Sequence, residues 1–152
     1  MALAIPTWIP HPLAEERRKS AIAFAKAILA IQNDLIEAHF NEGLKIAIWK
    51  YSEHDCRTKH QTRFQTQGVL NAPKSKKNHE HVIPIKTIRA QIIGQPHAVA
   101  QILSTVVACT VLVEEHAALM AAERANPELS GWDRYRAAGL CVYDLQTQKQ
   151  FI

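Results

Sequence analysis

The chain has 152 residues, the usual size of one compact domain, so we expect a single hydrophobic core. Hydrophobic residues make up 47% and charged residues 21%, a globular balance that excludes an intrinsically disordered protein. The formal net charge of +4 is compatible with a nucleic-acid partner but does not require one.

The cysteines and the apolar segments indicate a reduced, non-membrane environment. Cys56, Cys109 and Cys141 are odd in number and form no CxxC pair, which argues against a zinc knuckle and a secreted disulfide framework. The first residues lack a basic segment and are interrupted by prolines, unlike a signal peptide. The longest apolar stretch, residues 21–31, is far shorter than the roughly 20 residues that a bilayer requires. We therefore expect a cytoplasmic protein with no membrane partner.

Residues 1–51 are predicted to form an extended arm followed by a long helix or helical hairpin. Pro12 suits the first position of a helix, and Glu15 and Glu16 suit its first turn. Asn41-Glu42-Gly43 is typical of a turn, although Gly43 could also lie within a continuous helix. Apolar residues recur at helical spacing in two adjoining stripes, at Phe24, Ile28, Ile31 and Leu35 and at Ile22, Leu29, Ile36 and Phe40. So wide an apolar arc predicts packing on more than one side, within the domain or in a homodimer.

Residues 52–78 are predicted to be a basic loop region. Six cations precede a cluster of histidines, and a phosphate-binding surface is most useful beside a reactive group. We take these six as candidate nucleic-acid contacts: Arg57, Lys59, Arg63, Lys74, Lys76 and Lys77.

Residues 79–152 are predicted to alternate strands and helices. A strand-like segment through Val82-Ile83-Pro84 leads into a helix over 85–93, and a second helix is expected from Pro96 to about Val106. An apolar, β-rich run at 108–113 predicts a buried strand, followed by a helix that ends near Asn126-Pro127. A short helix around Trp132 and a strand over 140–144 complete the chain.

His79-Glu80-His81 is the sequence feature richest in chemistry. Hydrolysis of a phosphodiester requires a base, a divalent cation and cationic groups that hold the backbone. His81 can serve as the base because imidazole titrates near neutral pH, with His79 in support. Glu80 and the distal His116 can supply an oxygen and a nitrogen to a metal ion, if their side chains lie within about 5 Å.

These residues resemble a known nuclease motif. Glu80-His81-Val82-Ile83-Pro84 is similar to the opening of the HNH, or His-Me finger, endonucleases, and the segment from Cys109 to His116 is similar to its closing half. The resemblance covers residues 77–122. It implies a ββα-metal unit in which His81 is the general base, while Glu80 and His116 bind one divalent metal, Mg²⁺ or alternatively Mn²⁺.

We therefore expect an α+β, mainly helical single domain. Its small ββα-like unit should carry a helical insertion between the strands, and its partner should be a nucleic acid, with DNA favoured over RNA. Two alternatives remain. The family's middle Asn has no equivalent, which favours a non-catalytic helical interaction module. His79 and His81 could instead act as the acid-base pair of a metal-independent RNA-cleaving toxin.

Overall fold

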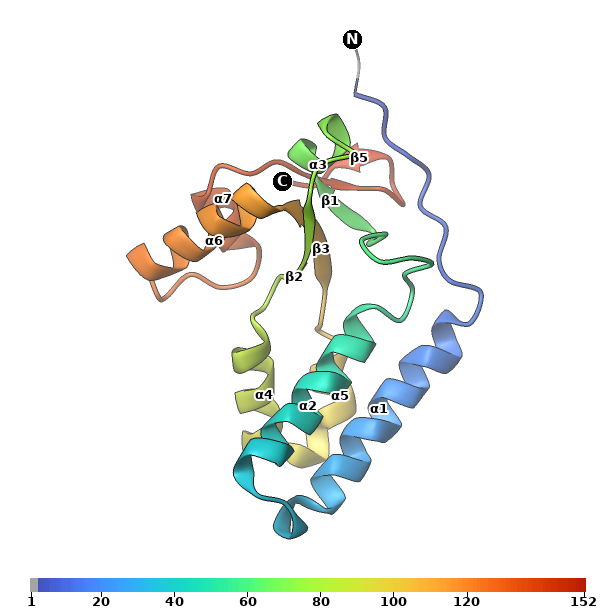
Figure 1. Cartoon of the computed structure of the whole chain (residues 1–152), viewed down its shortest axis with the longest axis vertical. Coiled ribbons are helices and arrows are strands. Elements are labelled where there is room, and N and C mark those ends of the chain that lie inside the picture. Colours follow the sequence, from blue (N-terminus) through green and yellow to red (C-terminus); the bar gives the residue numbers. More distant parts are fainter. Residues whose placement is uncertain (1–2) are drawn as a thin grey trace. The chain divides into compact units, whose positions relative to one another are not determined.

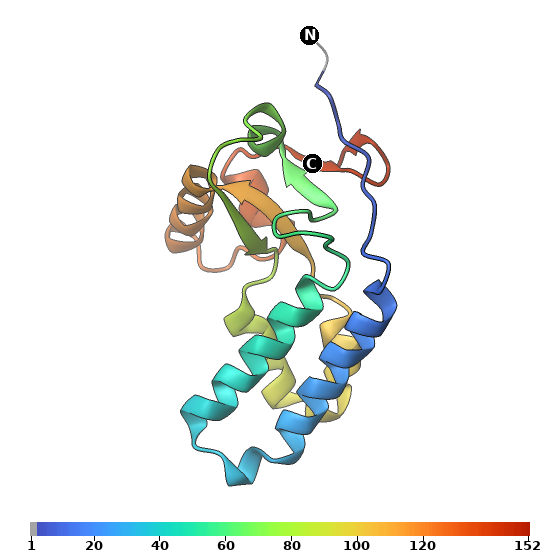
Figure 2. The ribbon, with the colours of Figure 1, turned by 45° about the vertical axis from the view of Figure 1, so that its right-hand side comes forward.

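A computed structural model describes residues 3–152 of the chain, which adopt the mainly helical α+β fold that the sequence predicts. The chain forms two compact units, each built from segments that are discontinuous in sequence. A helical unit comprises His11–Asp55 and Ile83–Val107. A sheet unit comprises the N-terminal arm up to Pro10, Cys56–Val82 and Ala108–Ile152. Figures 1 and 2 show the elements of each unit.

The helical unit packs two long helices with two shorter ones. Its elements are α1 (Ala14–Ala30), η1 (Gln32–Asp34), α2 (Glu37–Ser52), α4 (Ile85–Gly94), η2 (Pro96–Ala98) and α5 (Val99–Leu103). Their apolar stripes meet in one core, whose fully buried members include Leu44, Ile48, Ile88, Ile92 and Leu103. The insertion between the two expected strands is thus part of the same core as the N-terminal helices.

Gly43 lies in the middle of α2, so the turn expected at residues 41–43 is wrong. The chain instead reverses at residues 31–36, between α1 and α2. A Cβ atom at Gly43 would lie 2.9 Å from Ile28 Cδ1, closer than van der Waals contact allows. The glycine therefore serves close packing of α1 on α2 rather than a turn.

The sheet unit contains a five-stranded mixed sheet in the order β2-β3-β1-β4-β5. Its elements are β1 (Phe64–Thr66), α3 (Gln67–Asn71), β2 (Lys77–His81), β3 (Ala108–Leu112), α6 (Val113–Ala125), α7 (Trp132–Ala137), β4 (Val142–Asp144) and β5 (Lys149–Gln150). β1 and β3 are parallel, and the other pairs are antiparallel. All five residues of β3 are buried, as its apolar sequence predicts for a central strand.

Three expectations in this part of the chain require correction. The expected loop region contains β1 and α3, because Phe64 contacts Trp132 and Phe151 and thereby anchors a strand. The strand at the histidines ends at His81, before Val82-Ile83-Pro84. The helix expected over 96–106 consists of a 3₁₀ turn and the short α5. No helix within residues 3–152 has the length and apolar character needed to cross a membrane.

Candidate metal centre and histidine pair

β2, β3 and α6 form the ββα arrangement that positions the candidate metal ligands (Figure 1). β2 and β3 pair antiparallel, with Glu80 opposite Cys109 and His81 opposite Ala108. α6 follows β3 directly, and its start is held by Glu115, whose carboxylate accepts hydrogen bonds from the backbone N–H of Leu112 and from the Thr66 hydroxyl. His116 is consequently in the first turn of a helix whose position is fixed against the sheet.

Glu80 and His116 meet as the sequence predicts. The distance from Glu80 Oε2 to His116 Nδ1 is 2.6 Å, within the range of about 5 Å expected for two ligands of one ion. The side chain of Glu80 is 11% exposed and that of His116 is 38% exposed, so solvent reaches the imidazole. In the structure the pair is a hydrogen bond, in which the carboxylate accepts.

The carboxylate of this pair suits a small hard cation such as Mg²⁺, whereas the imidazole nitrogen of His116 is a donor more typical of transition metals. Two ligands at right angles around Mg²⁺ lie about 3.0 Å apart, when each is about 2.1 Å from the ion. The Glu80–His116 pair would therefore need to open by only a few tenths of an ångström. Mg²⁺ also keeps several water ligands and commonly takes one or two carboxylates. Within residues 3–152 no group of three or more His, Cys, Asp or Glu side chains is placed to hold a metal ion.

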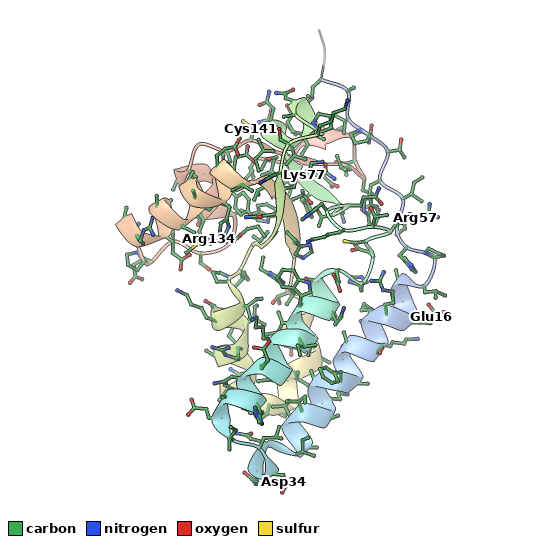
Figure 3. All side chains as sticks on the ribbon, viewed as in Figure 1. Glu16, Asp34, Arg57, Lys77, Arg134 and Cys141 are labelled. Carbon is green, nitrogen blue, oxygen red and sulfur yellow. The ribbon has the colours of Figure 1, made fainter. Side chains whose placement is uncertain are left out.

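Arg134 is the residue of this site that the sequence did not suggest. Its side chain is 1% exposed, and its guanidinium donates to Glu80 Oε1 at 3.0 Å and to Glu123 Oε2 at 3.1 Å. It also donates to the backbone carbonyls of His81 and Val82. Figure 3 labels this side chain. Arg134 thus joins α7, α6 and the end of β2, and it fixes the carboxylate that faces His116.

Only the fold brings Arg134 to Glu80, because 54 residues separate the two in sequence. Glu123, likewise missed, lies 11 residues from Arg134 and in a different helix. Neither pair has a local spacing that a sequence pattern could reveal. The one available signal was a cation between two aromatic residues, Trp132 and Tyr135, in the short helix that the sequence predicts.

His79 and His81 lie on the opposite face of β2 from Glu80, because side chains alternate along a strand. Their ring centroids are 5.2 Å apart. His81 is 5% exposed, and burial, with a smaller contribution from the neighbouring His79, lowers the pKa of His81 to about 3. Its imidazole is therefore neutral at physiological pH, and as long as it stays buried it is a weak base. His79 is half-buried, so it is the more accessible of the two rings.

The six predicted nucleic-acid contacts do not behave as one set. Arg63 forms an ion pair with Asp144, to which it donates hydrogen bonds from Nε and Nη2 at 2.8 and 2.7 Å. Lys77 Nζ donates to the carbonyl of Pro73. The other four are exposed and available to a partner: Arg57, Lys59, Lys74 and Lys76.

Comparison of the chain with family models, with curated proteins and with solved structures gave no match.

Proposed function

We propose that the protein is a divalent-metal-dependent endonuclease-like hydrolase of nucleic-acid phosphodiesters. The observation that carries the proposal is the meeting of Glu80 and His116 at 2.6 Å within a β2-β3-α6 arrangement. The resemblance to ββα-metal nucleases requires one metal ligand near the end of the first strand and the other in the first turn of the helix, which are the positions of Glu80 in β2 and His116 in α6. Four exposed cations, Arg57, Lys59, Lys74 and Lys76, would contact the phosphate backbone.

Glu80 and His116 would hold the metal ion, preferably Mg²⁺, with Mn²⁺ as the alternative. A divalent ion at such a centre stabilises the negative charge that develops on the leaving oxygen. Arg134 holds Glu80 in place, because its guanidinium donates to Glu80 Oε1 at 3.0 Å. His116 remains partly exposed, which leaves a path for water and for substrate.

His81 is the proposed general base. Once exposed to solvent, its imidazole would take a proton from water as the water oxygen attacks phosphorus, and the bond from phosphorus to the leaving alcohol oxygen would break. Because the ring is 5% exposed and on the other face from Glu80, this role requires β2 to rearrange when substrate binds, so that His81 becomes accessible and reaches the phosphate held at Glu80 and His116. The base is accordingly the part of the proposal that a mutation tests most sharply.

The experiment is a cleavage assay on supercoiled plasmid and on RNA, with Mg²⁺, with Mn²⁺, and with excess chelator. We expect cleavage only with metal, and loss of cleavage in both His81→Ala and His116→Ala. His97→Ala is the matched control, because His97 is an exposed histidine of the helical unit. Circular dichroism confirms that each variant is folded. Full activity in His81→Ala would remove that residue as the base.

A second candidate function rests on the histidine pair alone. His79 and His81 lie on one face with ring centroids 5.2 Å apart, a separation suited to an acid-base pair. In RNA, one ring would take the proton of the 2′-hydroxyl as its oxygen attacks phosphorus, and the other would protonate the leaving 5′ oxygen. Cleavage of RNA but not DNA in excess chelator, lost in His79→Ala, selects this candidate over the first.

We also propose that the helical unit forms a homodimer, as the wide apolar arc suggested. Four of its apolar side chains remain 39–63% exposed: Phe24, Ile31, Ile36 and Ile46. Light scattering during size-exclusion chromatography measures the mass directly. A monomer at high protein concentration removes this proposal, and a dimer that Phe24→Glu dissociates supports it. If no substrate is cleaved under any condition, the interaction-module alternative takes precedence.

A further inference from the structure

The sheet unit contains a pocket that none of the proposed catalytic residues uses. Its volume is about 440 Å³, within the range of small-molecule sites. One wall is the N-terminal arm around Trp8, and the other is formed by β1 and the loop before it, with Gln65 and Arg57. Gln148 Nε2 donates to the carbonyl of Pro6 and so ties the arm to the sheet unit. Figure 3 labels Arg57 at this pocket.

The polar atoms of the pocket have unused hydrogen-bonding capacity. The indole N–H of Trp8 is buried and has no hydrogen-bond partner among residues 3–152. Such an orphaned donor is costly unless a ligand or water accepts from it. The carboxamide of Gln65 is 9% exposed and makes one hydrogen bond, from Nε2 to the carbonyl of Thr62 at 3.3 Å. The carboxamide of Gln65 can therefore bind the edge of a ligand that offers acceptors and donors, whereas the buried indole N–H of Trp8 is reached only if the ring moves.

The apolar and charged parts of the pocket define the ligand further. Trp8 and Leu145 offer apolar surface, and an aromatic side chain such as Trp8 binds planar rings by stacking. Arg57 is exposed and makes no ion pair with the residues that the structure describes, so it can bind an anion. A planar ring with hydrogen-bonding edges that carries an anionic group is the chemistry of a nucleotide.

We propose that this pocket binds a nucleobase, with Arg57 on the phosphate attached to it. The proposal rests on the proposed nucleic-acid function and specifies a substrate subsite for it. Gln65 faces the same side of the sheet as Thr110 and His79, through the register of β1 with β3 and of β3 with β2. A single-stranded nucleic acid with one base in the pocket would thus be held on the face of the β-sheet that carries His79 and His81.

The test is a binding measurement in excess chelator, so that it does not depend on metal or on cleavage. Calorimetric titration uses a nucleoside monophosphate, ribose 5-phosphate as the same anion without a base, a short single-stranded oligonucleotide and the corresponding duplex. We expect the nucleoside monophosphate or the single strand to bind, and ribose 5-phosphate to bind at least tenfold more weakly, as loss of a stacked base implies. Binding of the mononucleotide alone identifies a free nucleotide as the ligand, and binding of the single strand identifies a base within a chain.

Two variants assign the binding to the pocket. Trp8→Ala removes the stacking surface and should weaken binding about tenfold or more. Trp49→Ala is the matched control, since Trp49 lies in α2 of the helical unit. If Trp8→Ala disturbs the arm, Arg57→Gln at an exposed position provides the second variant. The proposal is overturned if neither base-containing ligand binds, if ribose 5-phosphate binds equally well, or if Trp8→Ala and Arg57→Gln both bind normally. Normal binding by His116→Ala, with cleavage lost, separates this pocket from the metal centre.

Discussion

Replacement of Arg134 by methionine should be among the most destabilising changes in the sheet unit. The guanidinium is 1% exposed and donates to two carboxylates and to two backbone carbonyls. Methionine preserves much of the apolar stem but leaves Glu80 without its cation and the carbonyls of His81 and Val82 without a donor. Removing one partner of a buried ion pair typically costs about 3–5 kcal/mol in the free energy of unfolding. We expect a loss in that range for Arg134→Met.

The matched control is Arg136→Met, two residues further along the chain in the same helix. Arg136 is 58% exposed and pairs with Asp133, which is 67% exposed. Exposed ion pairs of this kind contribute about 0–1 kcal/mol. Urea unfolding followed by circular dichroism and by tryptophan fluorescence gives the two free energies. A cost below about 1 kcal/mol for Arg134→Met, or equal costs for the two variants, would refute the view that Arg134 fixes the end of β2.

Two further changes probe the electrostatics and the packing. The hydrogen bonds that Arg63 donates to Asp144 lower the pKa of the Asp144 carboxyl. The contribution of this ion pair to the free energy of unfolding should be fully present above the ordinary pKa of an aspartate and should be lost as the pH falls through the lowered pKa of Asp144. Acid titration of the free energy of unfolding should show this loss in the wild type and a weaker one in Asp144→Asn, whereas identical acid profiles would contradict the assignment. Gly43→Ala would place a Cβ atom 2.9 Å from Ile28 Cδ1 and 3.2 Å from Ile28 Cγ1 and Cγ2, and the better helix propensity of alanine, about 1 kcal/mol, offsets part of the overpacking cost of about 1–3 kcal/mol. Gly94→Ala meets nothing within 4 Å and should be neutral or stabilising. Thermal melts should therefore give a lower melting temperature for Gly43→Ala than for Gly94→Ala, and equal melting temperatures would contradict the packing argument.

Long periodic segments and buried apolar runs could be predicted from sequence. The helices over 85–93 and 114–125 and the strand over 108–113 depend on local apolar patterns, and each is found within about one residue of the expected bounds. The ββα arrangement followed from placing Glu80-His81 before a strand-then-helix pattern. The three-residue strand β1 could not be found in this way, because it depends on partners at Cys109 and Val142 that are remote in the chain.

The sequence identified individual residues of the candidate site by their chemical type, but it did not identify most of the contacts between them. The meeting of Glu80 with His116 followed from the motif, and the alternation of side chains along a regular strand already predicts that His79 and His81 lie on the face opposite Glu80. The burial that lowers the pKa of His81 is instead a property of the assembled unit. The ion pair of Arg63 could not be predicted either, because nothing in the basic segment around Arg63 indicates that Asp144, 81 residues further along the chain, pairs with it.

Binding of Mn²⁺ tests the central claim, that Glu80 and His116 form a ligand pair for a divalent cation. Calorimetric titration of the intact protein requires no knowledge of the substrate, and Mn²⁺ prefers the same carboxylate and water oxygens as Mg²⁺. The account predicts one Mn²⁺ per chain, an affinity at least tenfold weaker in His116→Ala, and an unchanged affinity in His97→Ala. Equal affinities in all three proteins, or no binding by the wild type, would contradict it.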